Sequence, residues 1–242
     1  MTTRIVTDLQ KLQNLYQLPL LQIDQDYDYL LTVIDNKLQL VSKNKNFNPL
    51  VIDFATGKLN YRLAHRSFKN ELLAKACGLK SLKNPTVLDT TAGLGRDAFM
   101  LASFGCRVTL LERHKIIAAL LQDGLTRGSQ DPNIADIINR MQLVVTDAKH
   151  YCLEPPHAFD IVYIDPMFPA KTKSALAKKE MQIFQSLLTD EDTDELFKTA
   201  KTCARSRVVV KRSLQSDFLG HEKPNHVIEG KSHRFDVYLY QS

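Results

Sequence analysis

The chain has 242 residues, of which 44% are hydrophobic and 24% are charged, and its formal net charge is +5. This is the composition of a soluble globular protein with room for one α/β domain, or for one domain and a small appendage. It excludes a membrane helix, since no apolar run approaches the necessary length of about 20 residues, while the modest positive charge permits a polyanionic partner without establishing one.

Cysteine usage and the start of the chain point to the cytoplasm. The four cysteines are scattered and form no Cys-x-x-Cys pair, so we expect neither a zinc or redox site of that type nor any other metal. No basic-then-apolar signal segment opens the chain. We therefore expect free thiols in a cytoplasmic protein without a membrane partner.

Residues 1–60 differ in pattern from the rest of the chain. Hydrophobic spacing predicts one helix and three strands, over residues 8–16, 29–34, 37–41 and 51–54. The first two strands flank Asp35-Asn36, a plausible two-residue hairpin turn. We interpret residues 1–60 as a small α+β appendage without a chemical motif, which is either a lid over the substrate or purely structural.

Residues 61–84 combine a basic start with a helical apolar stripe. The stripe comprises Leu72, Leu73, Ala76 and Leu79, and Gly78 is the candidate C-cap. The basic part comprises Arg62, His65, Arg66 and Lys69. These residues are either a solvated helix face or contacts for phosphate or a cofactor carboxylate at a helix start.

The central motif of the sequence is a strand, a glycine turn and a helix over residues 85–104. The strand ends at Asp89, Gly93 and Gly95 are spaced one apart, and helical spacing begins at Arg96. Glycine tolerates positive φ and lets the backbone approach a ligand closely. The motif is either a ligand-binding turn or an ordinary βα turn.

Two acids, Asp89 and Asp97, flank this turn. Both would repel the pyrophosphate of a dinucleotide, so a dehydrogenase ranks last among the possible functions. A cofactor with a cationic end fits better, because a carboxylate at the strand end can accept hydrogen bonds from its ammonium or hydroxyl groups.

A second strand, residues 107–112, ends in Glu112, which lies 23 positions beyond Asp89. A carboxylate about 20 residues after the glycine turn is the usual acceptor for ribose hydroxyls in a βαβ unit. Glu112 is thus a candidate ribose ligand, with a helix-capping charge as the alternative. Arg113 follows it and would flank the adenosine.

Helical spacing then predicts helices over residues 115–127 and 131–140, followed by a third strand over residues 141–145. Asp147 and Ala148 come just after that strand. Asp147 can accept a hydrogen bond from an adenine amino group, but a simple turn acid is an equally good interpretation.

The second strong motif is a buried strand, residues 161–164, that ends in Asp165-Pro166-Met-Phe168-Pro. The prolines stiffen this loop. Because ligands bind at the carboxyl ends of parallel strands, Asp165 should share one crevice with Asp89 and Glu112. Asp-Pro-x-Phe resembles the loop of amino-directed methyltransferases, which implies that Asp165 and backbone carbonyls hold an –NH2 group while Phe168 stacks on the base.

Further basic residues lie after this loop and near the end of the chain. The candidates for contacts with RNA phosphates in these regions are Lys171, Lys173, Lys178, Lys179, Lys211 and Arg212. The four lysines could equally form a solubilising helix start. The remaining elements predicted here are a helix over residues 190–203 and strands over residues 205–212, 226–228 and 235–240.

Several of these motifs together resemble the ribosomal small-subunit RNA methyltransferase J family, from about residue 50 to the end. They are Asp89-Thr-Thr-Ala-Gly-Leu-Gly-Arg-Asp-Ala-Phe, Leu111-Glu-Arg, Tyr163-Ile-Asp-Pro-Met-Phe-Pro, Lys173-Ser-Ala-Leu-Ala-Lys-Lys-Glu-Met, Val208-Val-Val-Lys-Arg and His233-Arg-Phe-Asp. The resemblance implies a Rossmann-like class I methyltransferase fold over residues 61–242. Its sheet would be seven-stranded and mostly parallel, with an antiparallel terminal edge.

The same resemblance implies a function and its residues. The chain would use S-adenosylmethionine, leaving S-adenosylhomocysteine, to methylate N2 of one guanine near the 3′ end of 16S rRNA in the small ribosomal subunit. The implied cofactor contacts are Arg96, Asp97, Glu112, Arg113, Asp147, Ala148 and Asp165, beside Asp89, Gly93 and Gly95 from the turn. Two alternatives remain, namely methylation of another amino group in DNA or protein, and a non-catalytic RNA-binding assembly factor. A monomer is slightly favoured.

Overall fold

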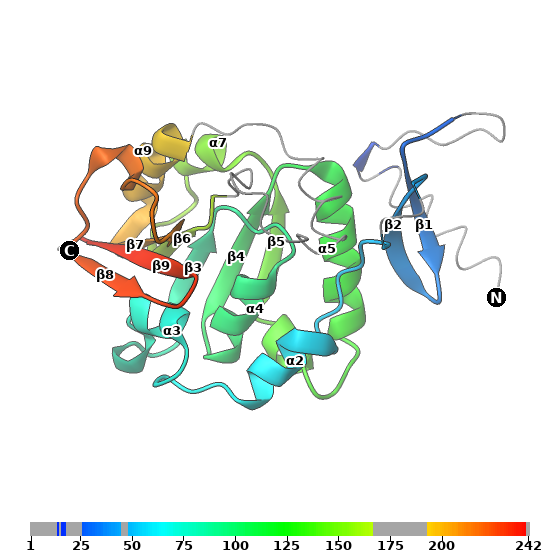
Figure 1. The fold of residues 1–242 in the computed structure, drawn as a ribbon, viewed down its shortest axis with the longest axis horizontal. Coiled ribbons are helices and arrows are strands. Elements are labelled where there is room, and N and C mark those ends of the chain that lie inside the picture. Colours follow the sequence, from blue (N-terminus) through cyan, green and yellow to red (C-terminus); the bar gives the residue numbers. More distant parts are fainter. Residues whose placement is uncertain (1–13, 15, 18–25, 45–47, 167–192, 241–242) are drawn as a thin grey trace.

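The computed structural model describes residues 14, 16–17, 26–44, 48–166 and 193–240 (Figure 1). Its strands are β1 (Tyr29–Ile34), β2 (Lys37–Ser42), β3 (Thr86–Asp89), β4 (Arg107–Glu112), β5 (Met141–Val145), β6 (Phe159–Ile164), β7 (Ala204–Ser213), β8 (His226–Glu229) and β9 (His233–Leu239). Its α-helices are α2 (Gly57–Ala64), α3 (Leu72–Ala76), α4 (Arg96–Ser103), α5 (Lys115–Gly128), α6 (Ala135–Ile138), α7 (Ala148–Leu153) and α9 (Thr193–Cys203).

Seven strands form one sheet in the order β5-β4-β3-β6-β7-β9-β8. Strands β5, β4, β3, β6 and β7 run parallel, and β9 is antiparallel to both β7 and β8. The predicted antiparallel terminal edge is therefore confirmed. The chain builds outward from β3 to β4 and β5, then returns to β6 on the other side of β3, and such a reversal opens a crevice at the carboxyl ends of β3 and β6.

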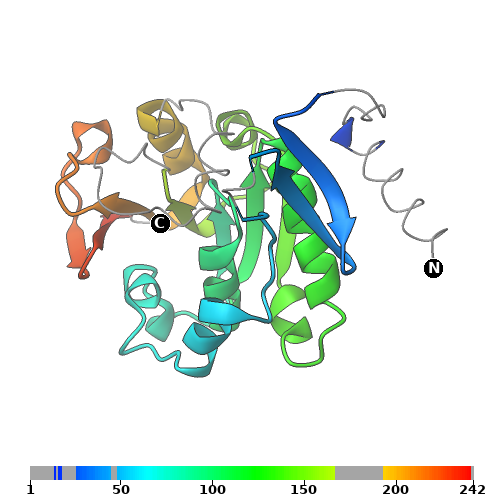
Figure 2. The same cartoon turned by 45° about the vertical axis from the view of Figure 1, so that its right-hand side comes forward.

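Helices cover both faces of this sheet (Figures 1 and 2). Successive side chains of a strand point to opposite faces, so Val87 packs in the core under α4 and α5, and Leu88 packs in the core under α7 and α9. Both side chains are fully buried. This explains why the central strands are continuous apolar runs rather than alternating patterns.

Strands β1 and β2 form the predicted hairpin, which lies beside α5 (Figure 2). Its turn residues Asp35 and Asn36 have φ values of 53° and 57°, the left-handed backbone that a two-residue hairpin turn of this kind requires. The backbone N–H of Leu38 donates a hydrogen bond to the Asp123 carboxylate on α5 at 3.2 Å. Nearly all of the helix predicted over residues 8–16 lies outside the described residues.

The strand predicted over residues 51–54 is wrong. Among the described residues of this segment, Leu50 pairs with the hairpin through an isolated antiparallel bridge to Leu40, and residues 51–54 make no strand pairing. The Asp53 carboxylate accepts the N–H of Ala55 at 3.0 Å, which closes a local turn. Ile52 is buried in the core without strand pairing.

Residues 57–78 form two helices around the loop of residues 65–71, rather than one basic-to-apolar helix. The predicted apolar stripe lies on α3 and just beyond it, and Gly78 follows with φ 65°, as expected of a residue that ends a helix. Helix α2 runs across residue 60, where we divide the chain into appendage and main domain. That division itself stays a prediction.

Helices elsewhere match their patterns with shifted ends. α5 has nearly the predicted bounds, α6 is shorter than expected, and α7 is an additional helix. The helix and strands predicted near the end of the chain correspond to α9, β7, β8 and β9. No helix among the described residues is long and apolar enough to cross a membrane.

Candidate functional site

The glycine turn between β3 and α4 is tied to the strands on both sides of β3. The N–H of Thr90 donates to the carbonyl of Tyr163 on β6 at 3.0 Å, and the N–H of Ala92 donates to the carbonyl of Leu111 on β4 at 3.1 Å. Gly93 and Gly95 have φ values of 50° and 69°, which allow the chain to reverse into α4. The turn is thereby held at the switch point of the sheet.

Glu112, at the end of β4, supports this turn directly. Its carboxylate accepts the N–H of Gly93 at 3.1 Å and the N–H of His114 at 2.7 Å. The side chain is buried, yet a carboxylate has about four lone-pair sites. The contact with His114, which immediately precedes α5, agrees with the capping interpretation, and the ribose role stays a prediction.

Asp147 caps the start of α7. Its Oδ1 accepts the N–H groups of Lys149 and His150 at 2.9 and 3.2 Å, and its Oδ2 lies 3.7 Å from Nη1 of Arg113. The turn-acid interpretation is therefore confirmed as a local role, while contact with adenine stays a prediction. Ala148 is buried as the first residue of the helix.

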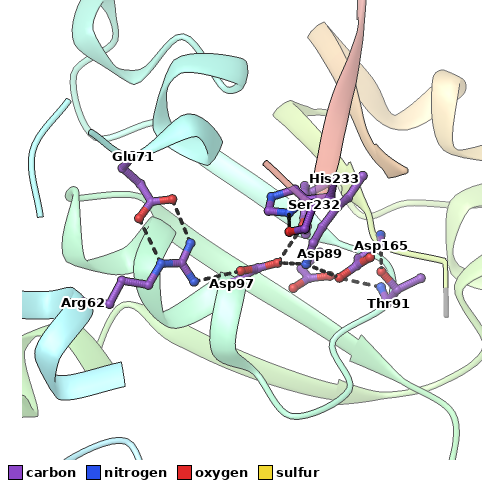
Figure 3. Close-up of polar contacts among 10 residues, drawn as sticks. Arg62, Glu71, Asp89, Thr91, Asp97, Asp165, Ser232 and His233 are labelled. Carbon is purple, nitrogen blue, oxygen red and sulfur yellow. Dashed lines mark hydrogen bonds and ion pairs between the residues drawn. The ribbon is translucent and has the colours of Figure 1, made fainter. Parts of the chain in front are cut away.

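Asp89 is a buried carboxyl group at the tip of β3, only 2% exposed. Its Oδ1 accepts the N–H of Thr91 at 3.1 Å (Figure 3). Burial, together with the charges of Asp97 and Asp165, raises the pKa of Asp89 to about 8. At neutral pH the ligand-free protein thus holds a largely protonated acid here, and a cationic group placed beside it would favour ionisation.

Asp97, in the first turn of α4, is the centre of a polar network (Figure 3). Its Oδ1 accepts from Nη1 of Arg62 at 3.2 Å, and its Oδ2 accepts from Nζ of Lys211 and from the hydroxyl of Tyr163, both at 2.8 Å. Burial opposes ionisation, but the charges of Lys211 and Arg62 and these hydrogen bonds lower the pKa of Asp97 to about 2. Asp97 is therefore ionised at neutral pH.

Asp165 follows β6 directly and joins the same network. Its Oδ2 accepts from Nζ of Lys211 at 2.7 Å, and its backbone N–H donates to Oγ1 of Thr91 at 2.7 Å. Burial raises its pKa to about 6, with Lys211 lowering and Asp97 raising it. Pro166 is buried beside it, and Phe168 lies outside the described residues.

Arg62 connects this network to the segment before β3. Its guanidinium makes two hydrogen bonds to the Glu71 carboxylate, at 2.9 and 2.7 Å. The sequence alone does not identify Glu71, Thr91 or Tyr163 as site residues. It suggests Arg62 only as one of several basic residues that would contact phosphate or a cofactor carboxylate, and its pattern contains no signal of a buried carboxylate partner.

The basic residues predicted to contact RNA occupy different environments. Arg66 and Lys69 are exposed in the loop after α2, as is Arg96, a predicted cofactor contact, at the start of α4. Lys211 is engaged by two carboxylates. Arg212 is 7% exposed and donates to the carbonyl of Asp217 at 2.6 Å, so we do not retain it as an RNA contact. Residues Lys171, Lys173, Lys178 and Lys179 lie outside the described residues.

An open cavity of about 570 Å³ lies between the hairpin, α2 and the glycine turn. Arg62, Leu94 and Arg96 line it on the side of the turn. Within the described residues, no cluster of three or more His, Cys, Asp or Glu side chains could hold a metal ion.

Comparisons with known proteins agree with this architecture. A family model described as a putative SAM-dependent methyltransferase matches residues 12–240. Ribosomal RNA small subunit methyltransferase J of Thioalkalivibrio sulfidiphilus is 49% identical over 194 residues, covering 79% of this chain and 76% of that protein. The protein of the same name from Coxiella burnetii is 42% identical over 237 residues, covering 97% and 92%.

A solved structure is also similar over nearly the whole chain. The crystal structure of a SAM-dependent methyltransferase from Neisseria gonorrhoeae has a TM-score of 0.74 at 34% sequence identity, covering 95% of this chain and 91% of that one. At this level of identity and coverage, the seven-stranded sheet described above is the class I methyltransferase fold.

Proposed function

The chain belongs to the ribosomal RNA small subunit methyltransferase J family, and we propose that it methylates the exocyclic N2 of one guanine near the 3′ end of 16S rRNA. The family is S-adenosylmethionine-dependent. The observation that supports an amino-group target is the Asp165 carboxyl group, which lies at the switch point and is joined through Lys211 to Asp97.

The residues around the glycine turn fit S-adenosylmethionine. Asp89 is a buried acid at the tip of β3, and a cationic group of the ligand placed beside it would favour the ionised form, which accepts hydrogen bonds. Glu112 and Asp147 are the proposed acceptors for ribose and adenine, and Gly93 and Gly95 allow a close approach. When bound, the sulfonium supplies an electrophilic methyl group, so the proposed reaction needs no metal.

Asp165 is the proposed acceptor for the hydrogens of the guanine amino group. An aromatic amine is a poor nucleophile because its lone pair is conjugated with the ring. A carboxylate that accepts its hydrogens favours the geometry in which the lone pair faces the methyl group. The loop after Asp165 begins with Pro166, whose fixed φ stiffens the backbone beside the proposed base pocket. Phe168 is the proposed stacking partner for the base.

The basic residues Arg66 and Lys69, together with Lys171, Lys173, Lys178 and Lys179, are the proposed contacts for rRNA phosphates. Such contacts position a nucleic acid without reading its sequence. They predict that binding to rRNA weakens steeply as the salt concentration rises. A shallower salt dependence, by about two phosphate contacts, in a variant lacking Arg66 and Lys69 would support the assignment of these two residues.

The central experiment is methyl transfer by the Asp165→Ala variant, with naked 16S rRNA, assembled 30S particles and naked DNA as substrates. We expect the wild type to methylate an rRNA guanine and the variant to lose transfer. Glu154→Ala is the control, because Glu154 is an exposed carboxylate on the surface. Full activity of Asp165→Ala would remove Asp165 from the mechanism, and transfer to DNA alone would favour the alternative substrate.

Two further measurements separate the remaining alternatives. Calorimetry with S-adenosylmethionine should detect binding, and no binding would favour a non-catalytic assembly factor. Mass mapping of modified nucleosides in 16S rRNA from cells lacking the protein should show one unmodified guanine near the 3′ end. A fully modified rRNA in those cells would contradict the proposed substrate.

A further inference from the structure

We propose that Lys211 is a positioning residue for methyl transfer, which keeps the Asp165 carboxylate ionised and leaves one of its oxygens available for the substrate amino group. The proposal rests on the function proposed above. It gives Lys211 a different role from the RNA-phosphate contact that its sequence context suggests, because its ammonium lies between two carboxylates and is only partly exposed.

The ammonium of Lys211 bridges two acids that come from different elements. Nζ lies 2.8 Å from Oδ2 of Asp97 on α4 and 2.7 Å from Oδ2 of Asp165 after β6. The Lys211 side chain is 26% exposed, so both ion pairs are partly shielded from solvent. No hydrogen bond from a described residue reaches Oδ1 of Asp165. The proposal assigns this oxygen to the substrate amino group.

Asp97 holds Lys211 in place, since it is itself fixed from two other sides. Nη1 of Arg62 binds its Oδ1, and the Tyr163 hydroxyl binds its Oδ2. Glu71 orients Arg62 through two hydrogen bonds. A lysine side chain is flexible, and an anchored anion at its tip restricts the positions of the ammonium. The orientation of Asp165 is therefore set by residues that do not touch the proposed substrate.

Lys211 also controls the charge of Asp165. Burial and Asp97 raise the pKa of Asp165, and Lys211 is the group that lowers it, with a result of about 6. Without Lys211 the raising influences remain, so the acid would be protonated at neutral pH. A protonated carboxyl group carries a donor hydrogen, which would meet the hydrogens of the substrate amino group.

Other ionisable groups around the two acids must be considered in any pH experiment. The groups that face the network come from each element packed around it, and they are Arg62, Glu71, Asp89, Asp97, Tyr163, Lys211 and His233. Of these, Asp97 is ionised at all working pH values. Burial and Lys211 lower the pKa of His233, so His233 does not supply a compensating cation at neutral pH.

The first test requires neither cofactor nor rRNA. Carboxyl ¹³C NMR of the ligand-free protein, with the Asp165 signal assigned by Asp165→Asn, measures the titration midpoint of this group. We expect Lys211→Met to raise the midpoint by about one pH unit or more and Lys211→Arg to leave it close to that of the wild type. An unchanged midpoint in Lys211→Met would overturn the proposal. Lys211→Gln serves if the methionine variant does not fold.

The second test is the pH profile of kcat on rRNA. We expect the acid limb of Lys211→Met to move to higher pH by the same amount as the NMR midpoint, with kcat near pH 7 reduced about tenfold and KM for rRNA little changed. Lys211→Arg should restore the profile. A raised KM with an unchanged profile would instead identify a phosphate contact and overturn the proposal.

The two tests also separate this proposal from the proposed function. If the wild type methylates no rRNA while the NMR midpoint shifts as expected, the proposed substrate is wrong and the control of Asp165 by Lys211 stands. If the wild type is active and neither the midpoint nor the profile moves in Lys211→Met, only the role of Lys211 is wrong.

Discussion

Replacing Gly95 with alanine should destabilise the protein for two separable reasons. Gly95 has φ 69°, and an alanine in this left-handed region costs roughly 1–2 kcal/mol. Its added Cβ would also lie 2.8 Å from Cδ1 of Leu121 and 3.1 Å from Cζ of Phe54. Crowding of this kind in a packed core costs roughly 1–3 kcal/mol, so the total loss for Gly95→Ala should be about 2–5 kcal/mol.

Gly57→Ala is the matched control for this substitution. Gly57 has φ 65°, nearly that of Gly95, but a Cβ built there meets no heavy atom within 4 Å. Its loss should therefore contain only the backbone cost of roughly 1–2 kcal/mol. The difference between the two variants measures the crowding against Leu121 and Phe54.

Urea unfolding followed by circular dichroism measures both free energies, provided that the slope with urea stays the same in all variants. Gly95→Ala should then cost less when it is made in a Leu121→Ala background than when it is made in the wild type, because Leu121→Ala has already removed the atom that the new Cβ meets. Equal losses in Gly95→Ala and Gly57→Ala would refute the argument from crowding.

Two further predictions concern buried charges. The folded-state pKa of Asp89, about 8, exceeds the unfolded value of about 3.9, so its contribution to stability is full below about pH 4 and is lost as pH rises through about 8. Asp89→Asn should remove this dependence, so the unfolding free energy of the variant minus that of the wild type should be larger at pH 8 than at pH 5. Urea unfolding of the ligand-free proteins measures this difference, and an equal difference at both pH values would contradict the prediction. Arg234 is 5% exposed and lies 2.8 Å from the buried Asp236. Arg234→Met should cost about 3–5 kcal/mol. Arg234→Met/Asp236→Leu should cost less, because it also removes the buried acid, although the carbonyls of Ser213, Leu214 and Ser216 lose their donor in both variants; equal unfolding free energies of the two variants would count against a role for the acid.

Local features of the chain were predictable from sequence because neighbouring residues determine them. Asp35 and Asn36 tolerate the left-handed backbone of a tight hairpin, and Gly78 tolerates the one that ends α3. The apolar run of β6 requires burial on both faces of a sheet. Each of these preferences depends on residues that are close in the chain, so the local sequence is sufficient to predict the structure there.

The sequence-based predictions are wrong or incomplete where a local pattern is compatible with more than one structure. Residues 51–54 have the composition of a strand, yet Ile52 is buried in the core although this segment does not pair with a strand. Asp147 was open to two interpretations, and its hydrogen bonds to Lys149 and His150 show a cap for the unpredicted helix α7. In each case the choice depends on which partners the rest of the fold brings near.

The sequence by itself determined the order of the elements and the placement of Asp89, Glu112 and Asp165 at strand ends, because burial and turn chemistry act along the chain. Only the tertiary structure decided the partners of Lys211, which lies 114 positions from Asp97 and 46 from Asp165. An ion pair depends on the distance between charges through space, and no local pattern of residues encodes that distance.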